Sequence, residues 1–297
     1  MQVSANGVRI EVDIHGPDRG EPLLMIMGLG MQLVAWPDGL VDALAGHGFR
    51  VIRFDNRDVG LSQPFDELGL PSLPLAALLH TLHLPVKAPY QLADLARDAV
   101  GVLDALGIGQ AHVCGASMGG MIAQHLAFSH ASRVKSLTLM MTTSGHRGLP
   151  APSLKVRRAL MSRPRSGATP AQKLENILDH YVSLYGVIGS PGYPAPPEVL
   201  RRRIAVGVKR SYRPQAVLRQ LVAIAADSHR AERLPRITAP TLVIHGEHDP
   251  LIPVAAAHDL AKRISGARLE IIPGWGHDLP EPLWPRLAAE VARTAGR

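Results

Sequence analysis

The chain has 297 residues, of which 46 % are hydrophobic and 19 % charged, and it carries a formal net charge of +7. This composition excludes a disordered or fibrous protein, and the length fits one large α/β domain or two ordinary domains. A single cysteine, Cys114, excludes a disulfide scaffold and a cysteine-based zinc site, and an aromatic content of 4 % disfavours stacking on nucleic-acid bases.

The N-terminal residues 1–7 lack the basic flank and the apolar core of a signal peptide. No run of about 18 apolar residues is present, so we expect no transmembrane helix. With no export signal and one thiol, the expected location is the cytoplasm.

Short apolar runs predict strands along the chain. Residues 8–14 alternate between apolar and polar side chains, as a half-buried strand does. Further short runs, which are apolar without alternation, predict buried strands at 22–27, 51–54, 111–114, 134–140, 241–245 and 269–272.

Helix-like segments lie between these runs. Apolar residues recur at helical spacing from Leu92 to Leu106, and Gly107 follows where a helix end favours glycine. Further helices are predicted at 118–128, 253–264 and 283–292. The alternation predicts an α/β fold with a mostly parallel central sheet flanked by helices, whose ligand chemistry lies in loops at the carboxyl ends of the strands.

Residues 146–233 interrupt this alternation and differ in composition. They carry 16 Lys and Arg against 5 Asp and Glu, and they are rich in proline. We therefore expect a core of residues 1–145 and 234–297, with 146–233 inserted as a lid. The positive charge is interpreted as solvated helix faces, or else as attraction to anionic substrates, an anionic membrane surface or a partner subunit, which leaves a homodimer open. No nucleic-acid-binding motif accompanies it.

The pentapeptide Gly115-Ala116-Ser117-Met118-Gly119 has the pattern G-x-S-x-G. It follows a predicted strand and opens a predicted helix, which is the context of a nucleophile elbow. Glycines are needed there because side chains at the flanking positions would collide with the neighbouring strand and helix. Ser117 is therefore the candidate nucleophile.

A serine nucleophile needs a base, and the base needs an orienting acid. Asp249 follows the strand at 241–245 and His277 follows the strand at 269–272, and the chain order Ser117, Asp249, His277 is that of the elbow motif's triads. Glu247 is a rival acid, but prolines after Asp249 indicate a turn leaving the strand end. Asp278 adjoins His277, and neighbouring side chains rarely meet productively.

The other histidines give no metal pattern. The pairs His245/His248 and His80/His83 lack a third ligand at recognisable spacing, so no metal is expected. Two backbone N–H groups are expected to form an oxyanion hole. One belongs to Met118, after the nucleophile, and the other to Leu29, in the glycine-containing loop 27–30.

These motifs resemble those of the α/β-hydrolase superfamily over essentially the whole chain. The matching segments, in order, are the loop 27–30, Asp55-Asn56-Arg57-Asp58-Val59-Gly60-Leu61-Ser62, the elbow, and the segments around Asp249 and His277. The stretch from Ile26 through Ala35-Trp36-Pro37 to Asp55 is similar to the aclacinomycin methylesterase-like branch. The resemblance implies the triad and oxyanion donors named above, and a helical cap at 146–233 after the sixth strand.

The chain departs from the family pattern at two positions. Met27 stands where many relatives have histidine, and Asp58 replaces the first glycine of the Asp-x-Arg-Gly-x-Gly-x-Ser motif. Arg57 is expected to brace loops near the site.

The resulting hypothesis is a cofactor-free serine hydrolase that cleaves small carboxylic esters through an acyl-enzyme on Ser117. Apolar residues of the cap, among them Leu154, Leu160 and Leu178, favour short to medium acyl groups, and the loop 73–84 is a further wall or core. Alternatives with the same triad are lactone, enol-lactone or C–C bond hydrolysis. A ligand-binding receptor built on this fold is a third alternative.

Overall fold

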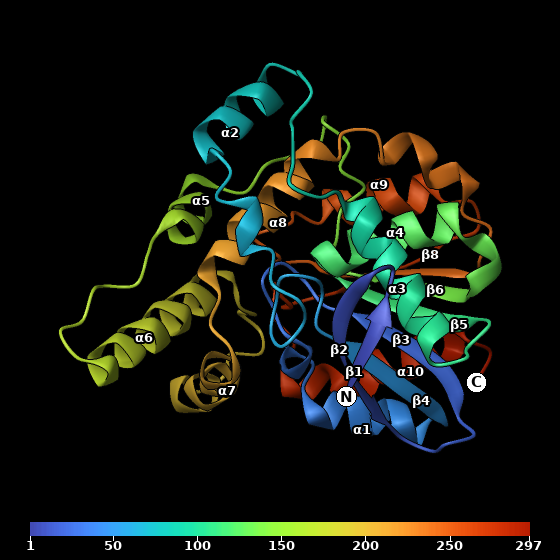
Figure 1. The fold of residues 1–297 in the computed structure, drawn as a ribbon. Helices are drawn as coiled ribbons and strands as arrows, with labels where there is room; N and C mark the ends of the chain where they lie inside the picture. Colours follow the sequence, from blue (N-terminus) through green and yellow to red (C-terminus); the bar gives the residue numbers. More distant parts are fainter.

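The computed structural model describes residues 1–297, which form one eight-stranded sheet covered by helices (Figure 1). The sheet order is β1-β2-β4-β3-β5-β6-β7-β8. The first two pairings, β1 with β2 and β2 with β4, are antiparallel, and all others are parallel. The strands are β1 (Gln2–Ala5), β2 (Val8–His15), β3 (Glu21–Ile26), β4 (Phe49–Phe54), β5 (Ala111–Ala116), β6 (Val134–Met140), β7 (Thr241–Gly246) and β8 (Arg268–Ile272).

Helices cover both faces of this sheet because its central strands are apolar on both sides. In β3, Leu24 and Ile26 belong to one buried apolar cluster with helical residues from 92–103, 118–128 and 256–260, whereas Leu23 and Met25 belong to a second with helical residues from 40–44 and 287–292. The predicted mostly parallel sheet flanked by helices is therefore confirmed. The helices are α1 (Asp38–Gly46), α2 (Leu73–Thr81), α3 (Leu92–Ala105), α4 (Met118–Ser129), α5 (Leu154–Met161), α6 (Pro170–Ile188), α7 (Pro197–Arg210), α8 (Pro214–Ala226), α9 (Ala255–Arg263) and α10 (Trp284–Thr294).

Segment 146–233 follows β6 and precedes β7 in the chain. It contains α5 to α8, which lie to one side of the sheet (Figure 1). None of the helices is both long and apolar enough to cross a membrane. Leu154 and Leu160 are exposed on α5, so these two residues do not line an acyl site as the sequence suggested. Leu178 of α6, in contrast, is buried.

The apolar loop expected at 73–84 is a helix over most of its length. Ser72 caps α2 by accepting a hydrogen bond from the Leu75 N–H, and Pro74 stands in its first turn, where proline is tolerated. The helix packs on α8, where the His80 ring contacts the Ala225 carbonyl at 3.1 Å. Four leucines of residues 73–84 face solvent, two in α2 and two after it, so the segment is neither core nor a wall of the site.

A buried ion pair joins α8 to the core at the position where the sequence departs from the family motif. Arg219 of α8 donates two hydrogen bonds to Asp58, of 2.5 and 2.9 Å, and both side chains are almost fully buried. The Tyr90 hydroxyl also donates to Asp58. At the end of α7, Arg210 pairs with the buried Asp55 at 2.6 Å. The hydrogen bonds from Arg219 and Tyr90 give the Asp58 carboxylate a role that the usual glycine could not fill.

We expect Arg219→Met to lower the free energy of unfolding by about 3–5 kcal/mol, because it leaves the charge of Asp58 buried without its partner. Urea unfolding measures the change. Arg202→Met is the matched control, since Arg202 is exposed on α7 and forms no ion pair; we expect a change within about 0.5 kcal/mol. Adding Asp58→Asn to Arg219→Met removes the stranded charge and should restore part of the loss. Equal stability of the two methionine variants would contradict this account.

Candidate active site

The strand–turn–helix around Ser117 has the geometry of a nucleophile elbow. Ser117 stands between β5 and α4 with φ +54° and ψ −121°, a strained conformation for a residue with a side chain. The strain is held in place from β6, because the Ser117 N–H donates to the Met140 carbonyl at 2.9 Å and the Thr142 hydroxyl donates to the Ser117 carbonyl at 2.6 Å.

The flanking glycines are required by close backbone approaches, as the sequence predicted. A Cβ at Gly115 would overlap the Gly119 carbonyl, and a Cβ at Gly119 would overlap the Ile26 carbonyl of β3. Any larger residue at either position would push α4 away from the sheet. The turn therefore fixes the Ser117 hydroxyl relative to β3, β5 and β6.

The structure brings the three predicted triad residues together. The Ser117 hydroxyl lies 3.1 Å from Nε2 of His277, and Nδ1 of His277 lies 2.7 Å from Oδ2 of Asp249. A carboxylate can only accept, so Nδ1 carries the proton and Nε2 is free to accept from the serine hydroxyl. Nucleophile, base and orienting acid are thus linked in one chain of hydrogen bonds.

Asp249 is buried, with 5 % of its surface exposed, yet it is held as the charged carboxylate. Burial alone would raise its pKa, but the charge and hydrogen bond of His277 and the contact with His245 lower the pKa well below the usual aspartate range. Its other oxygen accepts from the N–H groups of Leu251 and Ile252 at 2.9 and 2.8 Å. All these donors fix the carboxylate toward the imidazole.

The two rival acids lie elsewhere. The Glu247 side chain is half exposed and faces His248. Asp278 turns away from the histidine that precedes it and accepts a hydrogen bond from the Ser190 hydroxyl. Burial raises the pKa of Asp278, only partly offset by that bond. Neither acid forms a hydrogen bond or an ion pair with the His277 ring, whose partners are Asp249 and Ser117.

The segments that carry the two predicted oxyanion donors adjoin Ser117. Gly28 lies so close that a Cβ there would be 3.1 Å from the Ser117 Cβ, and Leu29 follows it. The N–H groups of Leu29 and Met118 form no hydrogen bond within the protein, so both are free to donate to a substrate oxygen. Met118 is the first residue of α4, where the helix dipole favours negative charge.

Helix α8 supports the oxyanion loop through a residue that the sequence did not single out. The buried Gln220 accepts from the Gly30 N–H at 2.8 Å and donates to the Arg57 carbonyl at 3.2 Å. Arg57 itself binds Asp98 of α3 through two hydrogen bonds of 2.6 Å, consistent with a bracing role. A polar residue in an amphipathic helix usually indicates a solvent-facing position, so no local signal marks Gln220.

The loop that carries His277 is held by the end of α6 in a similar way. The His277 N–H donates to the Ile188 carbonyl at 2.8 Å, and the Gly276 N–H donates to the Ser190 hydroxyl at 3.0 Å. Segment 146–233 therefore contacts the loops of both the base and the oxyanion donors.

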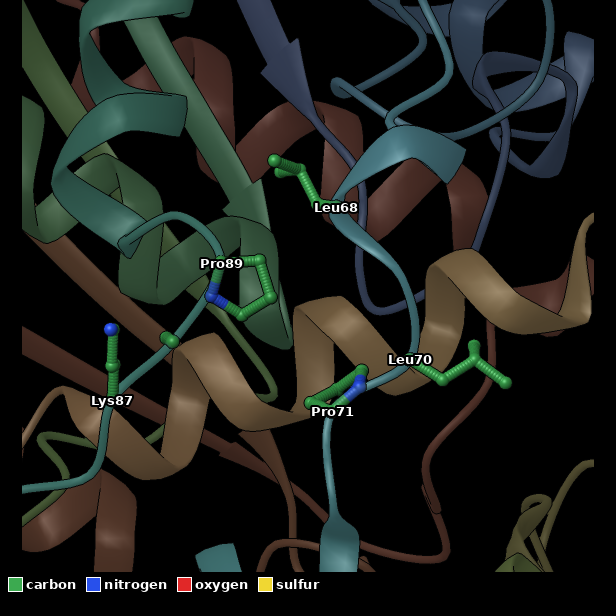
Figure 2. Close-up of a pocket in the computed structure, with 6 residues that line it drawn as sticks. Leu68, Leu70, Pro71, Lys87 and Pro89 are labelled. Atoms are coloured by element: carbon green, nitrogen blue, oxygen red, sulfur yellow. The ribbon is translucent and has the colours of Figure 1, made fainter.

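Other candidate residues lie apart from this site. Burial raises the pKa of the Cys114 thiol to about 12, so it is unreactive inside β5. No three histidine, cysteine, aspartate or glutamate side chains gather as a metal cluster. An open pocket of 240 Å³, lined by residues from 68–71 and 87–89, includes none of the triad residues (Figure 2).

Known proteins resemble this chain over nearly its whole length. The family model of the alpha/beta hydrolase fold matches residues 21–281. The chain is 32 % identical to rhodomycin D methylesterase DauP of Streptomyces sp. (strain C5), over 93 % of this chain and 91 % of the relative. It is 28 % identical to 2-hydroxymuconate semialdehyde hydrolase of Pseudomonas sp. (strain CF600), over 93 % and 86 %. The structure of the enol-lactonase from Burkholderia xenovorans LB400 matches 100 % of both chains with a TM-score of 0.74 at 24 % identity, which indicates a shared fold.

Proposed function

The chain belongs to the α/β-hydrolase fold family, in its aclacinomycin methylesterase-like branch, and from this premise we propose that it hydrolyses carboxylic esters through an acyl-enzyme on Ser117. One observation carries the proposal: Ser117, His277 and Asp249 form a continuous chain of hydrogen bonds of 3.1 and 2.7 Å. Methylesterases among the relatives support an ester substrate.

Acylation begins when the Ser117 oxygen attacks the ester carbonyl carbon and its proton passes to Nε2 of His277. The negative oxygen of the tetrahedral intermediate accepts from the N–H groups of Leu29 and Met118. The carboxylate of Asp249 stabilises the imidazolium. When the intermediate collapses, His277 donates the proton to the departing alkoxide, and an alcohol leaves.

Deacylation repeats these steps with water. His277 takes a proton from a water molecule, which attacks the acyl carbon of the Ser117 ester. The second tetrahedral intermediate uses the same two N–H groups and then expels the serine oxygen, which recovers its proton from His277. The products of the two half-reactions are an alcohol and a carboxylic acid, and water is the second substrate.

Segment 146–233 is proposed to act as the cap that bounds the acyl site. The hydrogen bonds from Gln220 to the oxyanion loop and from the end of α6 to the His277 loop support this role. We propose that a cap attached at both loops limits the space above Ser117 and so bounds the acyl group that can bind there.

Hydrolysis of p-nitrophenyl esters from acetate to palmitate tests both the ester and the acyl preference. We expect turnover to be highest for short to medium chains and to fall toward palmitate, because a bounded site excludes long chains. Emulsified triglyceride is the comparison substrate. A rate that keeps rising to long emulsified chains contradicts the bounded site, and no turnover of any ester contradicts the proposed function.

A second candidate reaction is hydrolysis of a C–C bond beside a ketone. The similarity to 2-hydroxymuconate semialdehyde hydrolase, 28 % identical over 93 % of this chain, favours it over the remaining alternatives. A dienoate diketone substrate distinguishes the two reactions by its spectral change. Cleavage of this substrate without turnover of any ester would favour C–C hydrolysis.

A further inference from the structure

A stripe of leucines on α2 and its C-terminal cap residue faces solvent. Leu75, Leu78 and Leu82 recur at the spacing of one helix face, and 54 %, 55 % and 57 % of their surfaces are exposed. Ala76, on the opposite side, is buried against the protein. A helix face of this kind, apolar and uncovered, usually marks a contact surface.

Residues 68–89 leave the core, form α2 and return, and we call them the α2 excursion. A pocket lies where its two ends meet the core. Figure 2 shows the two limbs of the excursion, one with Leu70 and Pro71 and the other with Lys87 and Pro89, on either side of it. The pocket is lined mainly by aliphatic and proline side chains, with one ammonium group. Leu68 and Leu70 are themselves about half exposed.

Helix α5, on the same side of the molecule, exposes both apolar and basic groups (Figure 1). Leu154 and Met161 are among the most exposed apolar residues of the chain. Around them the basic side chains are exposed and none forms an ion pair with a carboxylate: Lys155, Arg157, Arg158, Arg163 and Arg165. Figure 1 shows α2 and α5 on the same side of the molecule, away from both chain termini.

The charge of the two segments has one sign only. Residues 68–93 and 146–174 together contain 8 Lys and Arg, and all 25 Asp and Glu of the chain lie outside them. We call the exposed groups of these segments the leucine–basic surface. Carboxylates adjoin the ends of the segments in sequence, at Glu67, Asp94 and Glu175, but none of the eight basic side chains forms an ion pair, so the chemistry that complements them is anionic.

We propose that the leucine–basic surface docks on an anionic phospholipid bilayer. A bilayer offers a plane of phosphate groups for the basic side chains of α5 and an apolar layer just beneath it for the leucines of α2. A second copy of the chain fits less well, because two such faces would bring like charges together. Apolar and electrostatic contacts each bind weakly, and together they give reversible attachment.

Co-sedimentation of the full chain with large vesicles tests this proposal without any need for enzymatic turnover. One set of vesicles is phosphatidylcholine alone, and the other contains about one-third phosphatidylglycerol. We expect binding to the anionic vesicles, weakened by salt because the Debye length shortens, and much weaker binding to the neutral ones.

Two variants test the two parts of the surface. Leu75→Ser/Leu78→Ser/Leu82→Ser and Lys155→Gln/Arg157→Gln/Arg158→Gln should each lower the partition coefficient on anionic vesicles by about tenfold or more. The matched charge control is Arg19→Gln/Arg236→Gln/Lys262→Gln, three exposed basic residues without ion pairs elsewhere on the chain. It should change binding by only about twofold.

Three outcomes would overturn the proposal. The first is no binding to either vesicle at low salt. The second is equal binding to neutral and anionic vesicles, which would leave the basic residues without a role. The third is a wild-type dimer in light scattering that the leucine variant dissociates, which would make a second copy the partner of α2.

Discussion

Replacement of Ser117 by alanine is expected to lower kcat/KM for p-nitrophenyl esters by about 10³-fold or more. Alanine keeps the Cβ and the backbone conformation at φ +54° but removes the oxygen that forms the acyl-enzyme. His277 and the two oxyanion N–H groups remain, so some hydrolysis by water persists. The measurement compares wild type and variant at substrate concentrations well below KM.

A fluorophosphonate probe provides a second measurement on the same pair, because it forms a covalent bond only with an activated serine. Wild type should gain the mass of one phosphonyl group, and Ser117→Ala should gain none. Ser129→Ala is the matched control, since Ser129 lies exposed at the other end of α4. Full activity or labelling in Ser117→Ala would show that another residue is the nucleophile, and an unlabelled wild type would favour a binding protein.

The elbow and the triad could be predicted because their signals are local. The G-x-S-x-G pattern reports steric limits within five residues, and the structure shows the backbone approaches at Gly115 and Gly119 that impose them. Asp249 and His277 each follow a strand, and parallel strands bring their carboxyl ends to one edge. Chain order and strand position were therefore enough to predict Asp249 and His277 as the acid and the base of the candidate triad.

The contacts made by segment 146–233 could not be predicted in the same way. Arg219 lies 161 positions from Asp58, and Gln220 lies 190 positions from Gly30. No spacing rule connects residues so far apart in different elements. The sequence revealed Asp58 as an unusual acid in a known motif, but its partner on α8 became visible only when the helix was placed in three dimensions.

The excursion at 73–84 shows a different limit of sequence interpretation. Its sequence is as rich in leucine as that of a core helix. Because apolar residues are usually buried, the sequence suggested a segment that the protein covers. The structure packs α2 on α8 and leaves Leu75, Leu78 and Leu82 in solvent. Periodicity reports which face of a helix is apolar, but it does not report whether the protein itself covers that face.

Asp249→Asn is expected to lower kcat by about 10⁴-fold while leaving the fold intact. The amide oxygen can still accept from the N–H groups of Leu251 and Ile252. The amide nitrogen would then face Nδ1 of His277 and donate to it. The imidazole would carry its proton on Nε2, where it cannot accept from Ser117. Glu247→Gln, two residues away and half exposed, is the matched control and should retain activity.

The pH dependence of wild-type kcat/KM tests whether Asp249 stays charged. The pKa of Asp249 is held below the usual aspartate range, so its carboxylate keeps its charge as the pH falls through that range, and the charge is lost only below it. Protonation of Asp249 should therefore cause no loss of kcat/KM in the pH range where an ordinary aspartate titrates. A loss of activity traced to protonation of Asp249 within that range would mean that the carboxylate is not fixed in its charged form.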